Sequence, residues 1–192
     1  FPPRPTPRAQ NSDWWINPAD PKVMVQANDG GANVSLDGGA TWSVQSNQPT
    51  AELYQVAVDN QFPYRLYGAQ QDNTTVIVPS LALGDGQDYR VGPGCETGPI
   101  MPKPDDPNIV WGACKGQFSR MDMRTNFNEE RFWIGSESLY GNDPDRLRYR
   151  FQRTAPMEVS PVEPNTVYYG SQYVHRSRDG GMTWETISPD LT

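Results

Sequence analysis

Histidine and cysteine are both scarce in this chain, and each shortage limits the chemistry that it can perform. The 192 residues include one histidine and two cysteines. A metal site built from histidines is therefore not expected, and the cysteines allow at most one internal disulfide. We expect no metal and no cofactor.

Long apolar runs and an excess of basic charge are also lacking. No run approaches the roughly 18 apolar residues that a membrane-spanning helix needs, so we expect no membrane span. Sixteen lysines and arginines stand against 23 aspartates and glutamates, which gives a formal net charge of −7. A nucleic-acid backbone usually requires a basic face. We therefore expect no nucleic-acid partner, and the negative charge mainly favours solubility.

Turn-forming and aromatic residues are abundant instead. The chain holds 17 glycines, 19 prolines, six tryptophans and nine tyrosines. This number of large aromatic side chains argues against a disordered chain. Glycine and proline between short apolar stretches favour an all-β protein with many short strands and tight turns.

The octapeptide SLDGGATW at 35–42 returns as SRDGGMTW at 177–184. Its Asp-Gly-Gly sequence predicts a tight turn, because glycine adopts the positive φ that such turns need. The aspartate can accept hydrogen bonds from its own turn, and a carboxylate occupied in this way is a poor proton shuttle. The tryptophan can bury its ring between neighbouring sheets. We interpret ten residues as structural on this basis: Ser35, Asp37, Gly39, Thr41, Trp42, Ser177, Asp179, Gly181, Thr183 and Trp184.

A second repeat has a period typical of propeller blades. A proline precedes a short apolar stretch in NPADPKVMVQA at 17–27, VDNQFPYRLYGA at 58–69, PKPDDPNIVWGA at 102–113 and SPVEPNTVYYG at 160–170. The four prolines, at positions 21, 63, 107 and 164, are 42, 44 and 57 residues apart. A period of roughly 40–50 residues with several strands per unit predicts a β-propeller.

We therefore predict an all-β propeller with four-stranded blades, of which this chain holds four. Strand A precedes the proline, strand B follows it, strand C leads into the Asp turn and strand D carries the tryptophan. A proline-rich segment at 1–11 would precede a propeller portion at 12–192. The blades are expected at about 12–50, 51–94, 95–147 and 148–192.

The pattern Ser-x-Asp-x-Gly-x-Thr-Trp resembles the Asp-box, or bacterial neuraminidase repeat, of β-propeller proteins. The stretches NDGGANVSLDGGATW, VDNQFPYRLYGAQQDN and SQYVHRSRDGGMTWETISPDLT are similar to sortilin-like, repeat-containing exported bacterial proteins, many of which carry the name glycosyl hydrolase. The resemblance covers nearly the whole chain after about residue 11. It implies a propeller fold and a secreted or periplasmic location. The Arg-Ile-Pro segment of sialidases is missing, so sialidase chemistry is not expected.

Strand order predicts which residues share a rim. In an antiparallel blade the start of strand A, the end of strand B and the B–C turn lie at one rim, and the Asp turns lie at the other. Amides, carboxylates and an aromatic ring at the first rim would suit a hydroxyl-rich ligand, although ordinary turns use the same residue types. The candidate catalytic carboxylates are Asp13, Asp29, Asp72 and Glu96. The candidate ligand-binding residues are Asn28, Gln71, Asn73, Lys115, Gln172 and Tyr173.

Two functions follow from this rim. The first is a binding or scaffold module that holds a carbohydrate or protein ligand, and we favour it. The alternative is a glycoside hydrolase of the xyloglucanase type, in which two rim carboxylates stand roughly 5–9.5 Å apart.

Two further expectations concern a disulfide bond and the completion of the propeller ring. Cys95 and Cys114 flank strands A and B of the third blade at the same rim. We expect them to form a disulfide in an exported protein, with two buried thiols as the alternative. Four blades of a larger ring would leave open edges and faces. We expect other blades from the same precursor, a partner chain or a second copy, with a small closed ring as the alternative.

Overall fold

The computed structural model describes residues 11–28, 30–45, 50–81, 88–125, 129–134 and 143–192. The chain divides into two compact units, Phe1–Ala51 and Glu52–Thr192, and each is treated by itself. The described residues form strands, turns and one short 3-10 turn, Pro144–Arg146, with no α-helix among them. The prediction of an all-β chain is confirmed.

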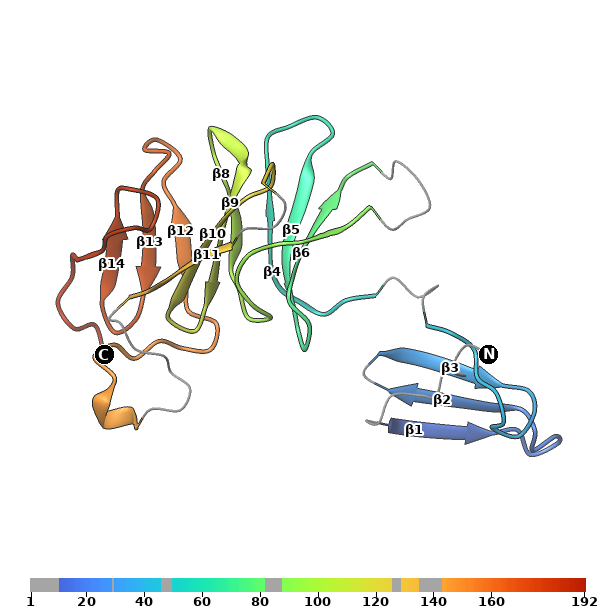
Figure 1. Cartoon of the computed structure of the whole chain (residues 1–192). Coiled ribbons are helices and arrows are strands. Elements are labelled where there is room, and N and C mark those ends of the chain that lie inside the picture. The colour runs from blue at the N-terminus through green and yellow to red at the C-terminus, as the bar shows by residue number, and fades with distance from the viewer. Residues whose placement is uncertain (1–10, 29, 46–49, 82–87, 126–128, 135–142) are drawn as a thin grey trace. The chain divides into compact units, whose positions relative to one another are not determined.

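The first unit holds one antiparallel sheet of three strands in the order β1-β2-β3 (Figure 1). Its strands are β1 (Asn11–Ile16), β2 (Met24–Asn28) and β3 (Gly31–Ser35). In the described part of this unit, a single residue, Ser43, takes the place of the expected fourth strand. The Ser43 amide donates to the Val34 carbonyl over 2.8 Å, and the Ser43 hydroxyl accepts from the Val34 amide over 2.9 Å.

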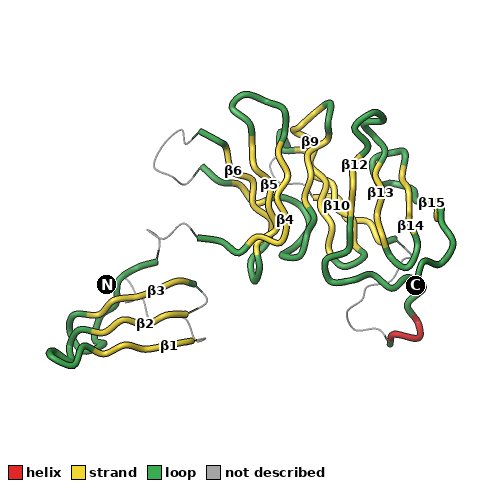
Figure 2. The backbone as a smooth tube through the Cα atoms, turned by 180° about the vertical axis from the view of Figure 1, so that it is seen from behind, coloured by secondary structure: helices red, strands yellow, loops and turns green. Residues whose placement is uncertain are grey.

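The second unit holds three antiparallel sheets of four strands each, and every sheet follows chain order. The three sheets stand side by side (Figure 2). The first comprises β4 (Leu53–Val58), β5 (Arg65–Gln70), β6 (Thr75–Pro79) and β7 (Arg90–Val91). The next comprises β8 (Ile100–Lys103), β9 (Asp106–Cys114), β10 (Gln117–Asp122) and β11 (Glu129–Trp133). The last comprises β12 (Met157–Val159), β13 (Val167–Gly170), β14 (Val174–Ser177) and β15 (Glu185–Thr186).

These four sheets are the blades of a partial β-propeller, as the repeats predict. We number them blades 1 to 4 in chain order. In the second unit the A strands of neighbouring blades meet, because β8 contacts both β4 and β12. Strands A therefore form the inner side of this unit, as they do in a propeller.

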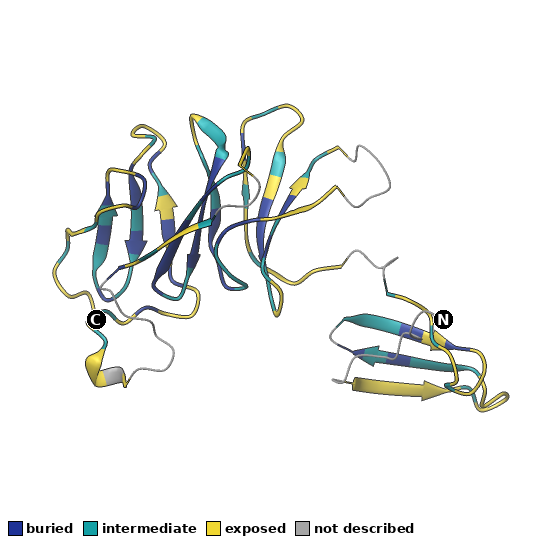
Figure 3. Ribbon diagram, in the orientation of Figure 1, coloured by how far each residue is buried: buried dark blue, intermediate teal, exposed yellow. Residues whose placement is uncertain are grey.

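The core of the second unit lies between blades, where facing side chains alternate along the strands. One cluster includes Trp111 and Phe118 of blade 3 with Tyr169 of blade 4. A smaller cluster joins Tyr67 of blade 2 to Val110 of blade 3. The buried segments accordingly lie along the strands between neighbouring sheets (Figure 3). Blade-to-blade packing, rather than any single sheet, fixes the positions of the turns at each rim.

Candidate functional site

The two repeated octapeptides share the hydrogen bonds of their serine, aspartate and threonine side chains. The Ser177 hydroxyl accepts from the Gly181 amide over 2.8 Å and donates to the Asp179 carboxylate over 2.8 Å. The Thr183 amide and hydroxyl donate to the two oxygens of that carboxylate over 2.9 and 2.5 Å. The first octapeptide repeats every one of these bonds.

Both octapeptide carboxylates are held ionised by their own turns. Hydrogen bonds from Thr41, the hydroxyl first, lower the pKa of Asp37 to about 2. For Asp179, partial burial acts to raise the pKa, but bonds from Thr183 and Ser177 outweigh it and keep the pKa below its usual value. The carboxylates therefore organise turns and are poorly suited to exchange protons with a substrate.

The opposite rim of the second unit brings several predicted residues together around Glu96. The Asp72 amide donates to one Glu96 oxygen over 3.0 Å. The Lys115 ammonium and the Arg153 guanidinium approach the other oxygen to 3.2 and 3.4 Å. Asp72 lies in the B–C turn of blade 2, Lys115 in that of blade 3, and Arg153 just before blade 4. One carboxylate thus joins three neighbouring blades at this rim.

The turns around Glu96 have an unusual backbone. Asp72 and Lys115 are the two non-glycine residues with positive φ among the described residues, at 58° and 51°. This conformation is uncommon for a residue with a Cβ and marks a turn held by its surroundings. The bond to Glu96 supplies such a hold at each turn.

Glu96 itself is suited to anchoring rather than to proton donation. The Asp72 amide, followed by the Lys115 ammonium, keeps the pKa of Glu96 below its usual value. The acid of a glycoside hydrolase needs a raised pKa. The exposed side chain of Asp72, by contrast, has no hydrogen bond or ion pair to any described residue. Of the two, Asp72 is the carboxylate that a ligand can reach.

An aromatic ring and an amide lie beside this cluster. The Tyr54 hydroxyl donates to the Gln71 side-chain oxygen over 2.6 Å. The Arg153 guanidinium lies 5.7 Å from the centroid of the Tyr54 ring. Asn73 is exposed in the same turn, and its amide donates to the Gln70 carbonyl. We call this group of residues the Glu96 rim: Tyr54, Gln71, Asp72, Glu96 and Lys115.

The predicted disulfide is confirmed. Cys95 and Cys114 are bonded, and their Cα atoms are 5.2 Å apart. Each cysteine directly precedes a member of the Glu96 rim, Glu96 or Lys115. The bridge therefore ties together the two chain segments that form the central ion pair of the rim.

Two other rim candidates in the second unit have mainly internal partners. The Gln172 side chain is buried, accepts from the Arg150 amide over 2.7 Å and donates to the Arg148 carbonyl over 3.3 Å. Tyr173 is partly buried, and its ring lies edge-on to Tyr149 with centroids 6.0 Å apart. These contacts hold the segment that leads into blade 4.

The candidates in the first unit do not form a comparable group. Asn28 is buried, and its amide donates to Gln26 and Asn33 over 2.8 and 3.1 Å. The exposed Asp13 carboxylate accepts from the amide of the next residue, Trp14. Asp29 lies outside the described residues. Asn28 is therefore part of an amide network inside its sheet.

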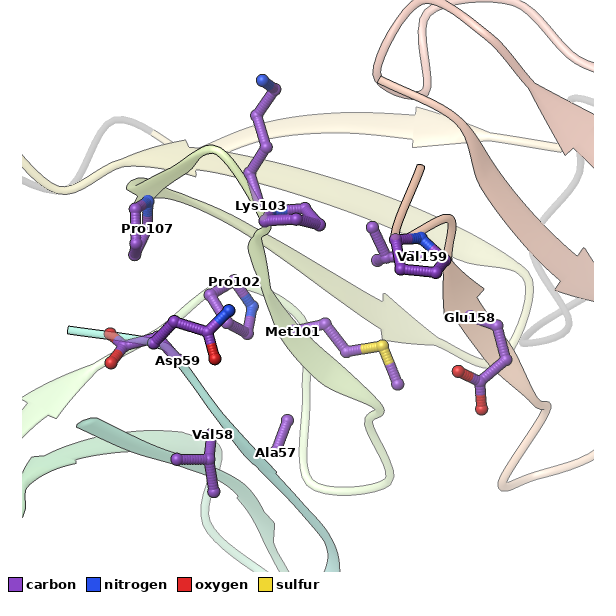
Figure 4. Close-up of a pocket in the computed structure, with 12 residues that line it drawn as sticks. Ala57, Val58, Asp59, Met101, Pro102, Lys103, Pro107, Glu158 and Val159 are labelled. Carbon is purple, nitrogen blue, oxygen red and sulfur yellow. The ribbon is translucent and has the colours of Figure 1, made fainter. Parts of the chain in front are cut away.

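Sequence reasoning missed a cavity of about 370 Å³ on the inner side of the second unit. It lies where strands β4, β8 and β12 end, so it is nearer the rim of the Asp turns than the Glu96 rim. Met101 lies between Asp59 and Glu158, and prolines 102 and 107 also line the space (Figure 4). The prolines of the A–B turns could have indicated this cavity, because several of them line it, but from the sequence we interpret them only as the repeated element of each blade.

The one buried carboxylate of this cavity already has its hydrogen bonds. Asp59 accepts from the Tyr67 hydroxyl over 2.8 Å and from the Arg65 amide over 3.0 Å. Burial acts to raise the pKa of Asp59, but these bonds outweigh it and keep the pKa low. Burial, followed by the bond to Asp59, raises the pKa of Tyr67. Asp59 thus stabilises the A–B turn of blade 2.

Across the described ranges, no group of three or more His, Cys, Asp or Glu side chains is placed to hold a metal ion. No helix in the described part of the chain is long and apolar enough to cross a membrane.

Comparisons with known proteins find similarity only among solved structures. No protein-family model matches the chain, and no curated protein matches it. An ancestral GH74 enzyme shares 18% identity at a TM-score of 0.47, over 94% of this chain and 24% of that one. The GH74 enzyme of Niastella koreensis shares 12% sequence identity at a TM-score of 0.46, and the match covers 92% of this chain and 24% of that enzyme. YCF48 bound to a D1 peptide shares 14% sequence identity at a TM-score of 0.42, and the match covers 86% of this chain and 50% of that protein. The chain therefore spans about a quarter of the length of the GH74 enzymes that it matches.

Proposed function

We propose that this chain is part of an exported Asp-box β-propeller, similar to the sortilin-like repeat proteins, and that it serves as a binding or scaffold module. The Glu96 rim would hold a carbohydrate or protein ligand. The observation that carries the proposal is the junction of three blades at Glu96, which fixes Asp72 and Lys115 in their turns.

This junction supports binding because it fixes polar groups before a ligand arrives. Ordering a side chain on binding costs free energy, so groups already held in place bind better. The Glu96 ion pairs, the disulfide and the Tyr54–Gln71 bond provide such order. Exposed Asp72 and Asn73 then offer a carboxylate and an amide to hydroxyl or peptide groups.

The disulfide supports the secreted or periplasmic location. Disulfides form and persist in oxidising compartments and are rare in the cytosol. The Cys95–Cys114 bridge therefore favours an extracytoplasmic protein.

Binding arrays with immobilised glycans and peptides would test the proposal on the purified chain. We expect a ligand whose binding weakens about tenfold in Asp72→Asn, since a loss near 1.4 kcal/mol fits one charged hydrogen bond. Asp105→Asn is the matched control, because Asp105 lies in the A–B turn of blade 3, at the opposite rim. Equal loss in both variants, or no ligand in either array, would reject the Glu96 rim.

A glycoside hydrolase is the second candidate, and the exposed Asp72 beside Glu96 is the observation that favours it. In that case the chain would release reducing sugar from xyloglucan. Asp72→Asn would abolish release while leaving binding measurable. Absence of release from any plant or bacterial glucan would leave the binding module as the function.

We further propose that other blades, from the same precursor or a partner chain, complete the ring. Val56 of β4 and Leu66 of β5 are exposed apolar side chains on one face of blade 2, and they support a covered face there. Native mass spectrometry should show an assembly larger than 21.5 kDa. A soluble monomer with its first and last blades in contact would contradict this.

A further inference from the structure

A second cavity in the second unit, of about 350 Å³, lies between blades 2 and 3 and is distinct from the Glu96 rim. Two arginines line it, Arg65 of β5 and Arg90 of β7. Met123 lines it from the other blade, just after β10. This volume lies in the range of small-molecule sites.

Strand register explains why the two arginines share one cavity. Ile77 of β6 pairs with Tyr67 on one side and with Arg90 on the other. Arg65 lies two positions before Tyr67 in the same strand. Residues that are paired, or two apart, point to the same face of a sheet. Arg65 and Arg90 therefore both face blade 3, beside the buried Tyr67 and Ile77.

Neither guanidinium forms an ion pair with another described residue. Arg65 donates to the Met123 sulfur over 3.8 Å, and a thioether is a weak acceptor. Among the described residues of the lining, Asp88 is the one acidic residue beside the two arginines. The described part of the lining therefore carries an excess of positive charge, in a chain of net charge −7.

The other described residues of the lining are apolar or aromatic. Ile77, Pro79 and Met123 supply aliphatic surface, and Tyr89 supplies an exposed ring. Guanidinium groups match the planar oxygens of carboxylates and the oxygens of sulfates. Aliphatic and aromatic surfaces suit the C–H faces of a sugar ring, which has hydroxyls at its edge.

We propose that this cavity, the Arg65–Arg90 cleft, binds an acidic sugar whose oxyanion contacts both arginines. The oxyanion can be the carboxylate of a uronic acid or the sulfate of a sulfated sugar. The proposal stands independently of the Glu96 rim, because the two sites share no residue.

Amide chemical-shift titration of the whole isotope-labelled chain tests the cleft with three probes. These are glucuronic acid, glucose 6-sulfate and glucose, each at low and high salt. We expect an acidic sugar to shift the amide signals of Arg90 and Met123, and glucose to leave them in place. Added salt should weaken binding, because the contact is between charges. The stronger acidic probe identifies the oxyanion.

Two variants and a control complete the test. Arg90→Gln should weaken the acidic sugar about tenfold or more, as expected for loss of one charge-assisted contact. Arg90 is exposed, so this variant should fold. Arg65→Lys keeps the charge but loses the planar fork, and should weaken carboxylate binding. Arg131→Gln, on β11 and exposed, should bind normally. Equal shifts with glucose, no shift with either acid, or full binding by Arg90→Gln would overturn the proposal.

Discussion

Trp184 packs edge-on against Phe118, with the two ring centroids 5.2 Å apart. Trp184 ends the second octapeptide and belongs to blade 4, whereas Phe118 lies on β10 of blade 3. The indole nitrogen of Trp184 also donates to the Gly181 carbonyl over 2.9 Å. The octapeptide therefore closes its own turn and also joins two blades.

Replacement of Gly181 by alanine should weaken this junction. A Cβ at Gly181 would lie 1.9 Å from a Phe118 ring carbon, and overpacking of this kind costs about 1–3 kcal/mol. Gly180→Ala is the matched control. It has a similar positive φ, but its Cβ meets only Trp111 at 3.7 Å. Urea unfolding should show a larger loss of stability in Gly181→Ala, and equal losses would contradict a blade-joining role.

Ser177→Ala should destabilise the turn, because a buried amide donor loses its acceptor. The Ser177 hydroxyl is buried and accepts from the Gly181 amide. Its removal leaves that amide without this acceptor, at a cost of about 1–3 kcal/mol. Met182→Ala, at an exposed position of the same octapeptide, should change the free energy of unfolding little. If both variants unfold at the same urea concentration, the serine is not a turn anchor.

The features that the sequence predicts correctly are local and repeated. The octapeptides and the proline-anchored strands indicate blades because turn chemistry and strand patterns act over a few residues. The disulfide is predictable because Cys95 precedes strand A of blade 3 and Cys114 ends its strand B, which places both cysteines at the same rim. The reduction of the fourth strand of blade 1 to one paired residue, within the described part of that blade, could not be predicted, since a tryptophan after an Asp turn does not guarantee strand pairing.

The candidate site is less predictable because it depends on tertiary contacts. Polarity in a turn cannot distinguish Asp72, which is exposed, from Gln172, whose amide is occupied by the backbone of another segment. The role of Glu96 requires donors from three blades. The Arg65–Arg90 cleft likewise depends on the pairing of both β5 and β7 with β6. This pairing brings together two arginines that are 25 residues apart in the sequence, and no local pattern encodes it.

Removal of the disulfide should lower stability and loosen the Glu96 rim. The bridge joins residues 19 apart, and closing a loop of this size contributes about 3 kcal/mol in the chain-entropy model. A Cys95→Ala, Cys114→Ala double variant should lose this amount in urea unfolding and bind rim ligands more weakly. Mass spectrometry of unreduced protein should show a mass lower by two hydrogens than that of the reduced form. Two free thiols in unreduced protein would contradict the bridge.

His175 should make the stability of the chain depend on pH between about 4 and 6.5. The imidazole is buried, with one ring nitrogen 2.7 Å from the Ser171 hydroxyl and the other 3.2 Å from the Thr186 hydroxyl. Burial, and then the positive charge of Arg148, lowers the pKa of His175 from 6.5 to about 4. The unfolded chain therefore binds a proton at a higher pH than the folded chain does.

This difference in proton uptake determines whether stability rises or falls with pH. Stability should be complete above pH 6.5 and should fall as the pH drops toward 4, because protonation then favours the unfolded chain. Between pH 7 and pH 5 the free energy of unfolding should decrease by about 2 kcal/mol. His175→Gln removes the one histidine of the chain, so it should abolish this dependence, while carboxylates act at lower pH. Urea unfolding at both pH values, with an NMR titration of the imidazole, provides the measurement. A wild-type stability that is flat from pH 7 to 5, or an imidazole pKa near 6.5, would show that His175 is not buried as described.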